Sequence, residues 1–105
     1  MIEKTDETLA GQTLKVGPLA YQIEIVRELR SESGSYLFGQ IDYDRMMIRI
    51  DEKYKDCQRT PFILWHEVVH AILDQAAQHE VSEATVEVLA LGIVDALRQN
   101  KLLRV

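Results

Sequence analysis

The segment from Pro61 to Gln78 constrains the fold of this chain most, because apolar residues occupy almost every side of the helix that it predicts. These residues recur at intervals of three and four, and Pro61 suits a first helical turn, so we expect a helix capped by Thr60 or Asp56. A helix that is apolar nearly all round is buried. The few polar side chains within it are therefore informative.

Alternating apolar and polar residues before this helix predict two pairs of short strands. Residues 13–25 form the first pair, with a turn at Gly17 and Pro18, and residues 36–50 form a second hairpin. Residues 27–35 have no apolar face at either period and are predicted to be a loop.

A second helix is expected to begin after Ser82, a good capping residue, and to end near Asn100. Strands followed by helices predict an α+β fold, in which an antiparallel sheet of three to four strands packs against two C-terminal helices. A chain of 105 residues forms one small domain. Residues 1–11 lack periodicity and are predicted to be a flexible tail, so the domain spans residues 12–105.

The composition argues against two classes of partner. The net charge is −5 and no basic block is present, which argues against nucleic acid. No apolar run approaches the roughly 20 residues that a membrane span needs, and the acidic start does not resemble a secretory signal. The single cysteine, Cys57, is expected to be a free thiol, and the location is expected to be cytoplasmic.

The motif that indicates chemistry is His66-Glu67-Val68-Val69-His70, an HExxH pattern within the buried helix. Imidazoles four residues apart project from one face of a helix, so both can reach one tetrahedral Zn²⁺. Glu67 lies about 100° round the helix, where its carboxylate suits a general base acting on water. Without a metal or another partner these polar groups would be desolvated, which favours a metal site.

A catalytic zinc site has three protein ligands and one open position, so a third ligand is needed. Glu80, Glu83 and Glu87 lie on or just before the second helix, and Glu83 and Glu87 share one helical face. His79 in the intervening turn is another candidate, although an exposed loop histidine is the simpler interpretation.

The sequence HEVVHAILD, followed by a short turn and SEATVEVLA, resembles the ImmA/IrrE-like small zinc metallopeptidases, including short versions found in phages. The resemblance covers about residues 13–100 and implies a minimal zincin-like fold of the gluzincin type. It implies that Glu83 binds the metal and that Glu87 accepts a hydrogen bond from a ligating histidine. The gap from His70 to Glu83 is shorter than in that family, and this keeps Glu87 as an alternative ligand.

Four aromatic residues are predicted to belong to the core: Tyr21, Phe38, Phe62 and Trp65. Tyr36 and Tyr43 have hydroxyls that could stabilise an oxyanion, but packing in a turn or on the sheet is the favoured interpretation. Asp74, one turn after His70, is predicted either to hydrogen-bond a ligating imidazole or to be a solvated charge.

The HExxH motif and this resemblance together predict a zinc-dependent metallopeptidase in which His66 and His70 hold Zn²⁺ and Glu67 is the general base. Glu83 is the third ligand that the resemblance implies. The expected substrate is a peptide or protein, by analogy a regulatory protein, lying along the edge of the hairpin at 36–50. A chain this short predicts an open site that a partner completes. The alternatives are a non-catalytic metal-binding regulatory or interaction module, and a helical hairpin that forms a homodimer.

Overall fold

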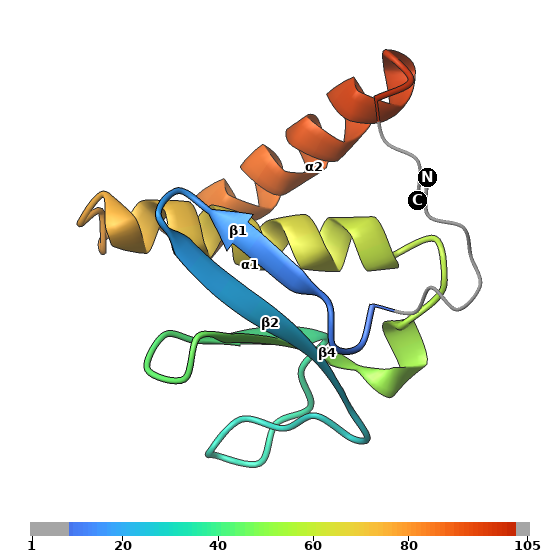
Figure 1. Ribbon diagram of the computed structural model, residues 1–105, viewed down its shortest axis with the longest axis vertical. Coiled ribbons are helices and arrows are strands. Elements are labelled where there is room, and N and C mark those ends of the chain that lie inside the picture. The colour runs from blue at the N-terminus through green and yellow to red at the C-terminus, as the bar shows by residue number, and fades with distance from the viewer. Residues whose placement is uncertain (1–8, 103–105) are drawn as a thin grey trace.

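The computed structural model of the protein describes residues 9–102 and has a four-stranded sheet and two helices, which confirms the α+β class (Figure 1). The helices and strands fall in the predicted regions, although the first helix ends at Gln75 instead of Gln78 and the third strand begins at Gly39 instead of Tyr36. In chain order they are β1 (Thr13–Val16), β2 (Leu19–Val26), β3 (Gly39–Asp42), β4 (Met47–Asp51), a short 3-10 helix (Glu52–Tyr54), α1 (Thr60–Gln75) and α2 (Glu83–Gln99).

The sheet is mixed, with the strand order β1-β2-β4-β3. The two predicted hairpins are antiparallel, but β4 pairs with β2 in parallel, so the prediction of a wholly antiparallel sheet is wrong. Parallel neighbours need a long connection, and the loop at 27–38 and the hairpin strand β3 supply it. The chain crosses to the far edge of the sheet, forms β3 there, and returns with β4 on the inside. As a result β3 is an edge strand.

The loop predicted at 27–35 is irregular and extends to residue 38 in the structure, and Leu29 anchors its beginning to the sheet. The Leu29 side chain is only 3% exposed, and its N–H donates a hydrogen bond to the Asp51 carboxylate at 2.7 Å. Sequence periodicity missed this anchor because a single buried leucine forms no pattern.

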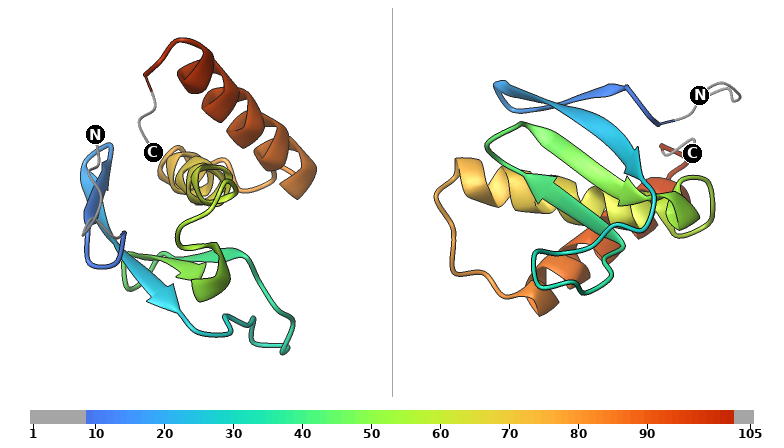
Figure 2. Two further views of the ribbon diagram at one scale, coloured as in Figure 1. Left: turned by 90° about the vertical axis from the view of Figure 1, so that its right-hand side faces the viewer. Right: turned by 90° about the horizontal axis from the view of Figure 1, so that it is seen from below.

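The helices form two layers rather than one (Figure 2). α1 packs on the sheet and α2 packs mainly on the other side of α1, so the expectation that both helices cover the sheet is wrong. This sandwiched position explains why α1 is apolar nearly all round. Two buried clusters mark its two faces: Ile23, Ile50 and Ile63 toward the sheet, and Val69, Val86 and Ala90 toward α2.

The two helices begin differently. Arg59 occupies the N-cap position of α1 and makes no side-chain capping hydrogen bond, so the predicted caps Thr60 and Asp56 are wrong. The Thr60 hydroxyl donates instead to the carbonyl of Tyr54. Ser82 caps α2 as predicted, because its hydroxyl oxygen accepts a hydrogen bond from the N–H of Thr85 at 3.1 Å.

The predicted tail at 1–11 falls only partly within the structure, because residues 1–8 lie outside the described residues. Leu9 packs against the cluster that contains Ile23, and the N–H of Gly11 donates a hydrogen bond to the Ile23 carbonyl at 2.8 Å. The chain therefore contacts β2 before β1 begins.

The outer side of α2 carries exposed apolar residues. Val88 is 66% exposed and Leu89 is 45% exposed. Across residues 9–102, neither helix combines the length and the apolar character that crossing a membrane requires.

Candidate metal centre

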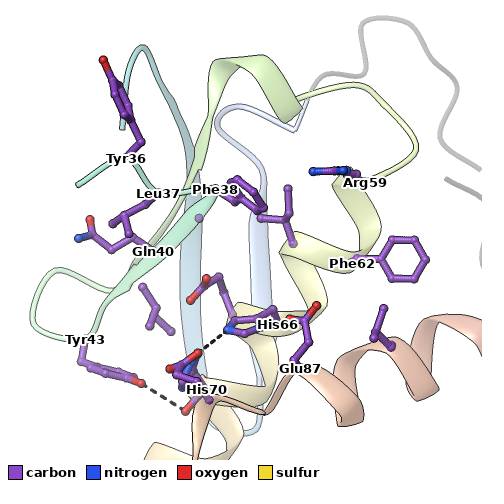
Figure 3. Close-up of a pocket in the computed structure, with 16 residues that line it drawn as sticks. Tyr36, Leu37, Phe38, Gln40, Tyr43, Arg59, Phe62, His66, His70 and Glu87 are labelled. Carbon is purple, nitrogen blue, oxygen red and sulfur yellow. Dashed lines mark hydrogen bonds and ion pairs between the residues drawn. The ribbon is translucent and has the colours of Figure 1, made fainter. Parts of the chain in front are cut away.

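A cleft of about 730 Å³ opens where β3, α1 and α2 meet (Figure 3). The segment from Tyr36 to Tyr43, which contains β3, contributes one wall. α1 contributes residues from Arg59 to His70, and α2 contributes Glu83, Glu87 and Leu91. The HExxH motif therefore lies in a cleft beside the edge strand.

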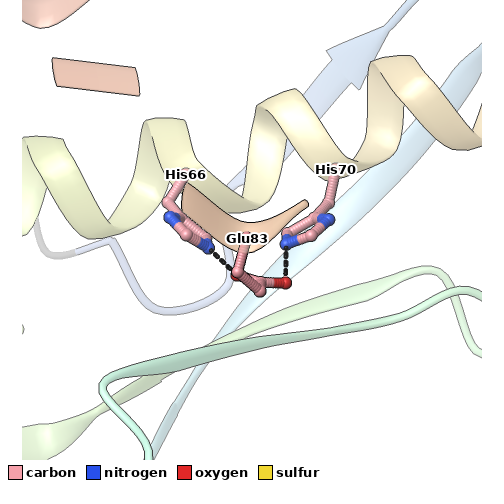
Figure 4. A group of neighbouring side chains, drawn as sticks. All are labelled: His66, His70 and Glu83. Atoms are coloured by element: carbon pink, nitrogen blue, oxygen red, sulfur yellow. Dashed lines mark hydrogen bonds and ion pairs between the residues drawn. The ribbon is translucent and has the colours of Figure 1, made fainter. Parts of the chain in front are cut away.

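Three potential ligands converge in this cleft: His66, His70 and Glu83 (Figure 4). One Glu83 oxygen lies 3.0 Å from Nε2 of His66, and the other lies 3.0 Å from Nε2 of His70. The ligand atoms of all three residues lie within 4.8 Å of one another. No further such cluster of histidine, cysteine, aspartate or glutamate occurs in the part of the chain that the structure describes.

Local structure accounts for this convergence. His66 and His70 are one turn apart on α1, so their rings stand edge to face with centroids 5.0 Å apart. Glu83 is the first residue of α2, directly after the Ser82 cap. The turn between the helices includes Ala77 in the left-handed conformation, with φ of 59°, and it returns the chain so that Glu83 faces the histidines.

Glu87 holds the other side of His66. Its Oε1 lies 2.9 Å from Nδ1 of His66, whereas Glu83 contacts Nε2 of the same ring. Glu83 and Glu87 are one turn apart on α2, as their spacing predicted. A carboxylate that accepts from Nδ1–H leaves Nε2 to a metal, which is the usual arrangement around a metal-binding histidine.

The donor set fits Zn²⁺. Two imidazoles and a carboxylate are zinc ligands, and ligand atoms about 2.1 Å from a tetrahedral ion lie roughly 3.4 Å apart. The 3.0 Å contacts of Glu83 with the two histidines are close to that separation. A carboxylate oxygen only accepts hydrogen bonds, so each of these contacts needs a proton on the histidine nitrogen. A metal ion bound between the groups could take the place of those protons.

Glu67 lies on the same turn of α1 but in a more enclosed position. It is 6% exposed, and none of the other described residues donates a hydrogen bond to its carboxylate. Burial raises its pKa to about 7; the nearby His66 opposes that rise, and Glu83 adds to it. A carboxyl group whose pKa is near neutrality can both take and return a proton at neutral pH.

Gly39 leaves room for the Glu67 carboxylate. A Cβ at this position would lie 2.7 Å from Cγ2 of Ile63 and 3.1 Å from Oε2 of Glu67. Only a glycine lets β3 approach α1 this closely. Gly39 is a functional residue that the strand pattern alone does not single out, although an isolated glycine in a strand signals a close approach of the backbone.

The register of β3 presents free main-chain groups to the cleft. The carbonyl of Phe38 accepts a hydrogen bond from the N–H of Asp51, and Gly39 lies opposite Ile50. Because hydrogen-bonded and non-hydrogen-bonded pairs alternate in an antiparallel ladder, the N–H and C=O groups of Gly39 and Ile41 point away from β4. Both residues line the cleft.

His79 lies outside the cluster. It is in the turn after α1, with its side chain 64% exposed and its Nδ1 3.9 Å from the Asp74 carboxylate. Asp74 therefore faces His79, and no hydrogen bond joins it to His66 or His70 among the described residues. Cys57 is exposed and free.

Of the two tyrosines considered for the site, Tyr43 lies nearer to the histidines. Its hydroxyl donates a hydrogen bond to the carbonyl of His70 at 3.5 Å. Partial burial and the carboxylates of Asp74 and Glu67 raise its pKa to about 12, so the hydroxyl stays a donor at neutral pH. Tyr36 is 66% exposed, and the guanidinium of Arg30 stacks on its ring.

The aromatic residues divide between core and cleft. Tyr21 is 1% exposed, which confirms its prediction, and Trp65 packs partly buried against the core. Phe38 is 53% exposed and lines the cleft, so its assignment to the core is wrong. Phe62, half-buried, lines the cleft as well. An apolar residue beside an edge strand has the same sequence pattern whether it faces a core or a cleft.

Compared with known proteins, the chain matches no family model, no curated protein and no solved structure.

Proposed function

We propose that this protein is a zinc-dependent peptidase of the kind that the HExxH motif predicts. The observation that carries the proposal is the convergence of His66, His70 and Glu83 beside the buried Glu67, in a cleft bordered by an edge strand. The resemblance to ImmA/IrrE-like peptidases agrees with this proposal but supplies no independent support.

The residues have distinct roles in this proposal. Zn²⁺ held by His66, His70 and Glu83 would supply an activated water at neutral pH and polarise the carbonyl of the scissile bond. Glu67 takes the proton of the attacking water and delivers it to the leaving amine. Glu87 fixes the orientation of His66 through Nδ1.

The substrate in this proposal is an extended peptide that adds to the sheet beside β3. The free main-chain groups of Gly39 and Ile41 supply the hydrogen bonds of such an addition. Gly39 lies beside Glu67, since a Cβ at Gly39 would be 3.1 Å from Oε2 of Glu67, so a peptide paired at this position lies near the proposed base. A flexible segment of a protein, including a regulatory protein, can meet this requirement.

The alternative is a metal-binding regulatory or interaction module without turnover. A structural zinc site is closed by four protein ligands. The described part of the chain brings three candidate ligands together and leaves His79 elsewhere, which favours a site with an open position.

The test combines metal content with peptide hydrolysis. Purified wild-type protein is expected to bind one zinc per chain and to cleave a mixture of peptides weakly, because the open site is expected to need a partner. His66→Ala is expected to lose both properties. Glu67→Gln should keep the zinc and lower cleavage by about 10²- to 10⁴-fold, the usual contribution of a general base.

Glu80 was a candidate ligand by sequence, but it is exposed and lies outside both the cleft and the cluster of His66, His70 and Glu83, so Glu80→Gln is the matched control. It should change neither property. Wild-type protein that binds no zinc, or Glu67→Gln protein that still hydrolyses peptides, would overturn the proposal. Zinc binding without cleavage would favour the regulatory module.

A further inference from the structure

The cleft has two chemically different ends on either side of His66. Toward Tyr43 its lining mixes two polar side chains, Tyr43 and Gln40, with the apolar Leu37 and Ile41. Toward the beginning of α1 lie Phe38 and Phe62, with Arg59 beyond them (Figure 3), and Leu91 of α2 also lines the cleft. We name this second end the Arg59 end.

The Arg59 end exposes apolar surface that the fold does not use. Phe38 is 53% exposed and Leu91 is 42% exposed, although they come from different elements on opposite walls. Leu91 extends the helical row of Glu83 and Glu87, with each residue four after the last. The row that faces the cleft thus changes from acidic to apolar along α2.

Arg59 lacks an acidic partner among the residues at 9–102. No carboxylate there forms an ion pair with it, and its guanidinium lies 5.8 Å from the centroid of the Phe38 ring. It is the only arginine or lysine in the described lining of the cleft, where the other charged groups are Glu67, Glu83 and Glu87. An unpaired guanidinium suits a carboxylate of a bound molecule.

The spacing sets the length of that molecule. Arg59 precedes His66 by about two helical turns, or roughly 10 Å at 1.5 Å per residue. An extended peptide spans that distance with about three residues. A peptide held at the histidines therefore reaches Arg59 with its third residue.

The direction of β3 sets the polarity of that peptide. β3 begins beside Ile63 at Gly39 and ends near His70, next to Tyr43. A peptide paired antiparallel to β3, the more stable arrangement, runs with its carboxyl end toward Arg59.

We propose that the Arg59 end is a specificity site of the proposed peptidase: Phe38, Phe62 and Leu91 take a large apolar side chain just after the scissile bond, and Arg59 takes a carboxylate about three residues after that bond. The assignment of a scissile bond depends on the proposed function. The carboxylate has two sources, the carboxyl end of a chain or an acidic side chain within it.

The test measures peptide binding to zinc-loaded Glu67→Gln protein, which does not hydrolyse the probe. The probe is acetyl-Ala-Ala-Phe-Ala-Ala with a free carboxylate, and dissociation constants come from calorimetric titration. Serine in place of phenylalanine should weaken binding about tenfold, because it removes a large apolar group. Amidation of the carboxyl end should weaken binding about three- to fivefold, as expected for one exposed ion pair.

Variants locate both effects. Arg59→Gln should abolish the difference between carboxylate and amide peptides, and Leu91→Ser should reduce the preference for phenylalanine. Arg45→Gln, an exposed arginine outside the cleft, is the matched control and should change neither. An amidated peptide with aspartate as its last residue separates the sources. Tight binding of this peptide supports an acidic side chain, and tight binding of the free carboxylate alone supports a chain end.

Equal binding of the carboxylate and amide peptides, or of the phenylalanine and serine peptides, would overturn this proposal. Binding is measured without cleavage, so the result is separate from the proposed activity. A wild-type protein that cleaves peptides without these preferences would retain the proposed function and lose the specificity site. A protein that shows these binding preferences but no cleavage would keep the specificity site and lose the proposed function.

Discussion

α1 and α2 both contribute to the candidate metal centre, but they hold their residues differently. α1 lies between the sheet and α2, so packing on both sides fixes the positions of its motif, and Glu67 is 6% exposed. α2 is covered on one side only, and the side chains of Glu83 and Glu87 are 73% and 56% exposed. The packing of α1 therefore determines where Glu67 and the two histidines lie. The position of Glu83, the third candidate ligand, depends on how α2 packs against α1.

The largest effect should come from shortening a buried side chain of α1. Ile63→Ala, which removes packing between α1 and the sheet, is expected to lower the free energy of unfolding by about 3 kcal/mol. Leu89→Ala on the outer side of α2 should change it by less than about 0.5 kcal/mol. Urea unfolding measures both variants, and equal losses would show that α2 is as enclosed as α1.

The pH dependence of stability should follow the buried carboxylate of α1. The folded pKa of Glu67, about 7, lies above its ordinary value of 4.5, so the folded state binds more protons than the unfolded state between these values. Stability of the metal-free protein should therefore fall as pH rises from about 4.5 to about 7, by up to about 3 kcal/mol. Urea unfolding at several pH values in chelator measures this loss. Glu67→Gln should remove it, whereas Glu32→Gln in an exposed loop should not.

The affinity for zinc should depend on Glu87, which α2 contributes to the site. Glu87→Gln is expected to weaken zinc binding about ten- to hundredfold, because His66 loses the carboxylate that orients it. Competition with a chelating dye measures the change. Unaltered affinity would mean that packing of α1 alone orients His66.

The smallest effect should come from the helix caps. Ser82→Ala removes the capping hydrogen bond of α2 and should lower stability by about 1 kcal/mol. Arg59→Gln changes the N-cap residue of α1, where no capping bond exists, and should cost less than about 0.5 kcal/mol. Thermal unfolding compares the two variants, and a larger loss for Arg59→Gln would contradict the asymmetry between the helices.

The elements of the fold could be predicted because each has a local signal. Helical periodicity, the Ser82 cap and the turn at Gly17 can each be recognised from a short stretch of neighbouring residues. The parallel pairing of β2 with β4 could not be predicted, because alternation says which face of a strand is buried and not which strand lies beside it. For the same reason the sequence pattern places Phe38 in the core, whereas its side chain lies in the cleft.

The histidines of the candidate site could be predicted from the sequence, but the choice of the third ligand could not. The HExxH spacing places His66 and His70 on one face of any helix, whatever surrounds it. The choice of Glu83 over His79 depends on the path of the turn between the helices, which sequence spacing does not define. The structure brings Glu83 to the histidines and His79 to Asp74, while metal binding itself stays a prediction.

The order of elements along the chain has a consequence for synthesis. β3, β4 and α1 are consecutive, so one continuous segment carries the edge strand, Gly39, Glu67 and both histidines. Contacts between neighbouring elements close short loops and form quickly. A nascent chain that has emerged as far as the end of α1 therefore contains one wall of the cleft and the base. The group of three candidate ligands is complete only after Glu83, at the beginning of α2, has also emerged from the ribosome.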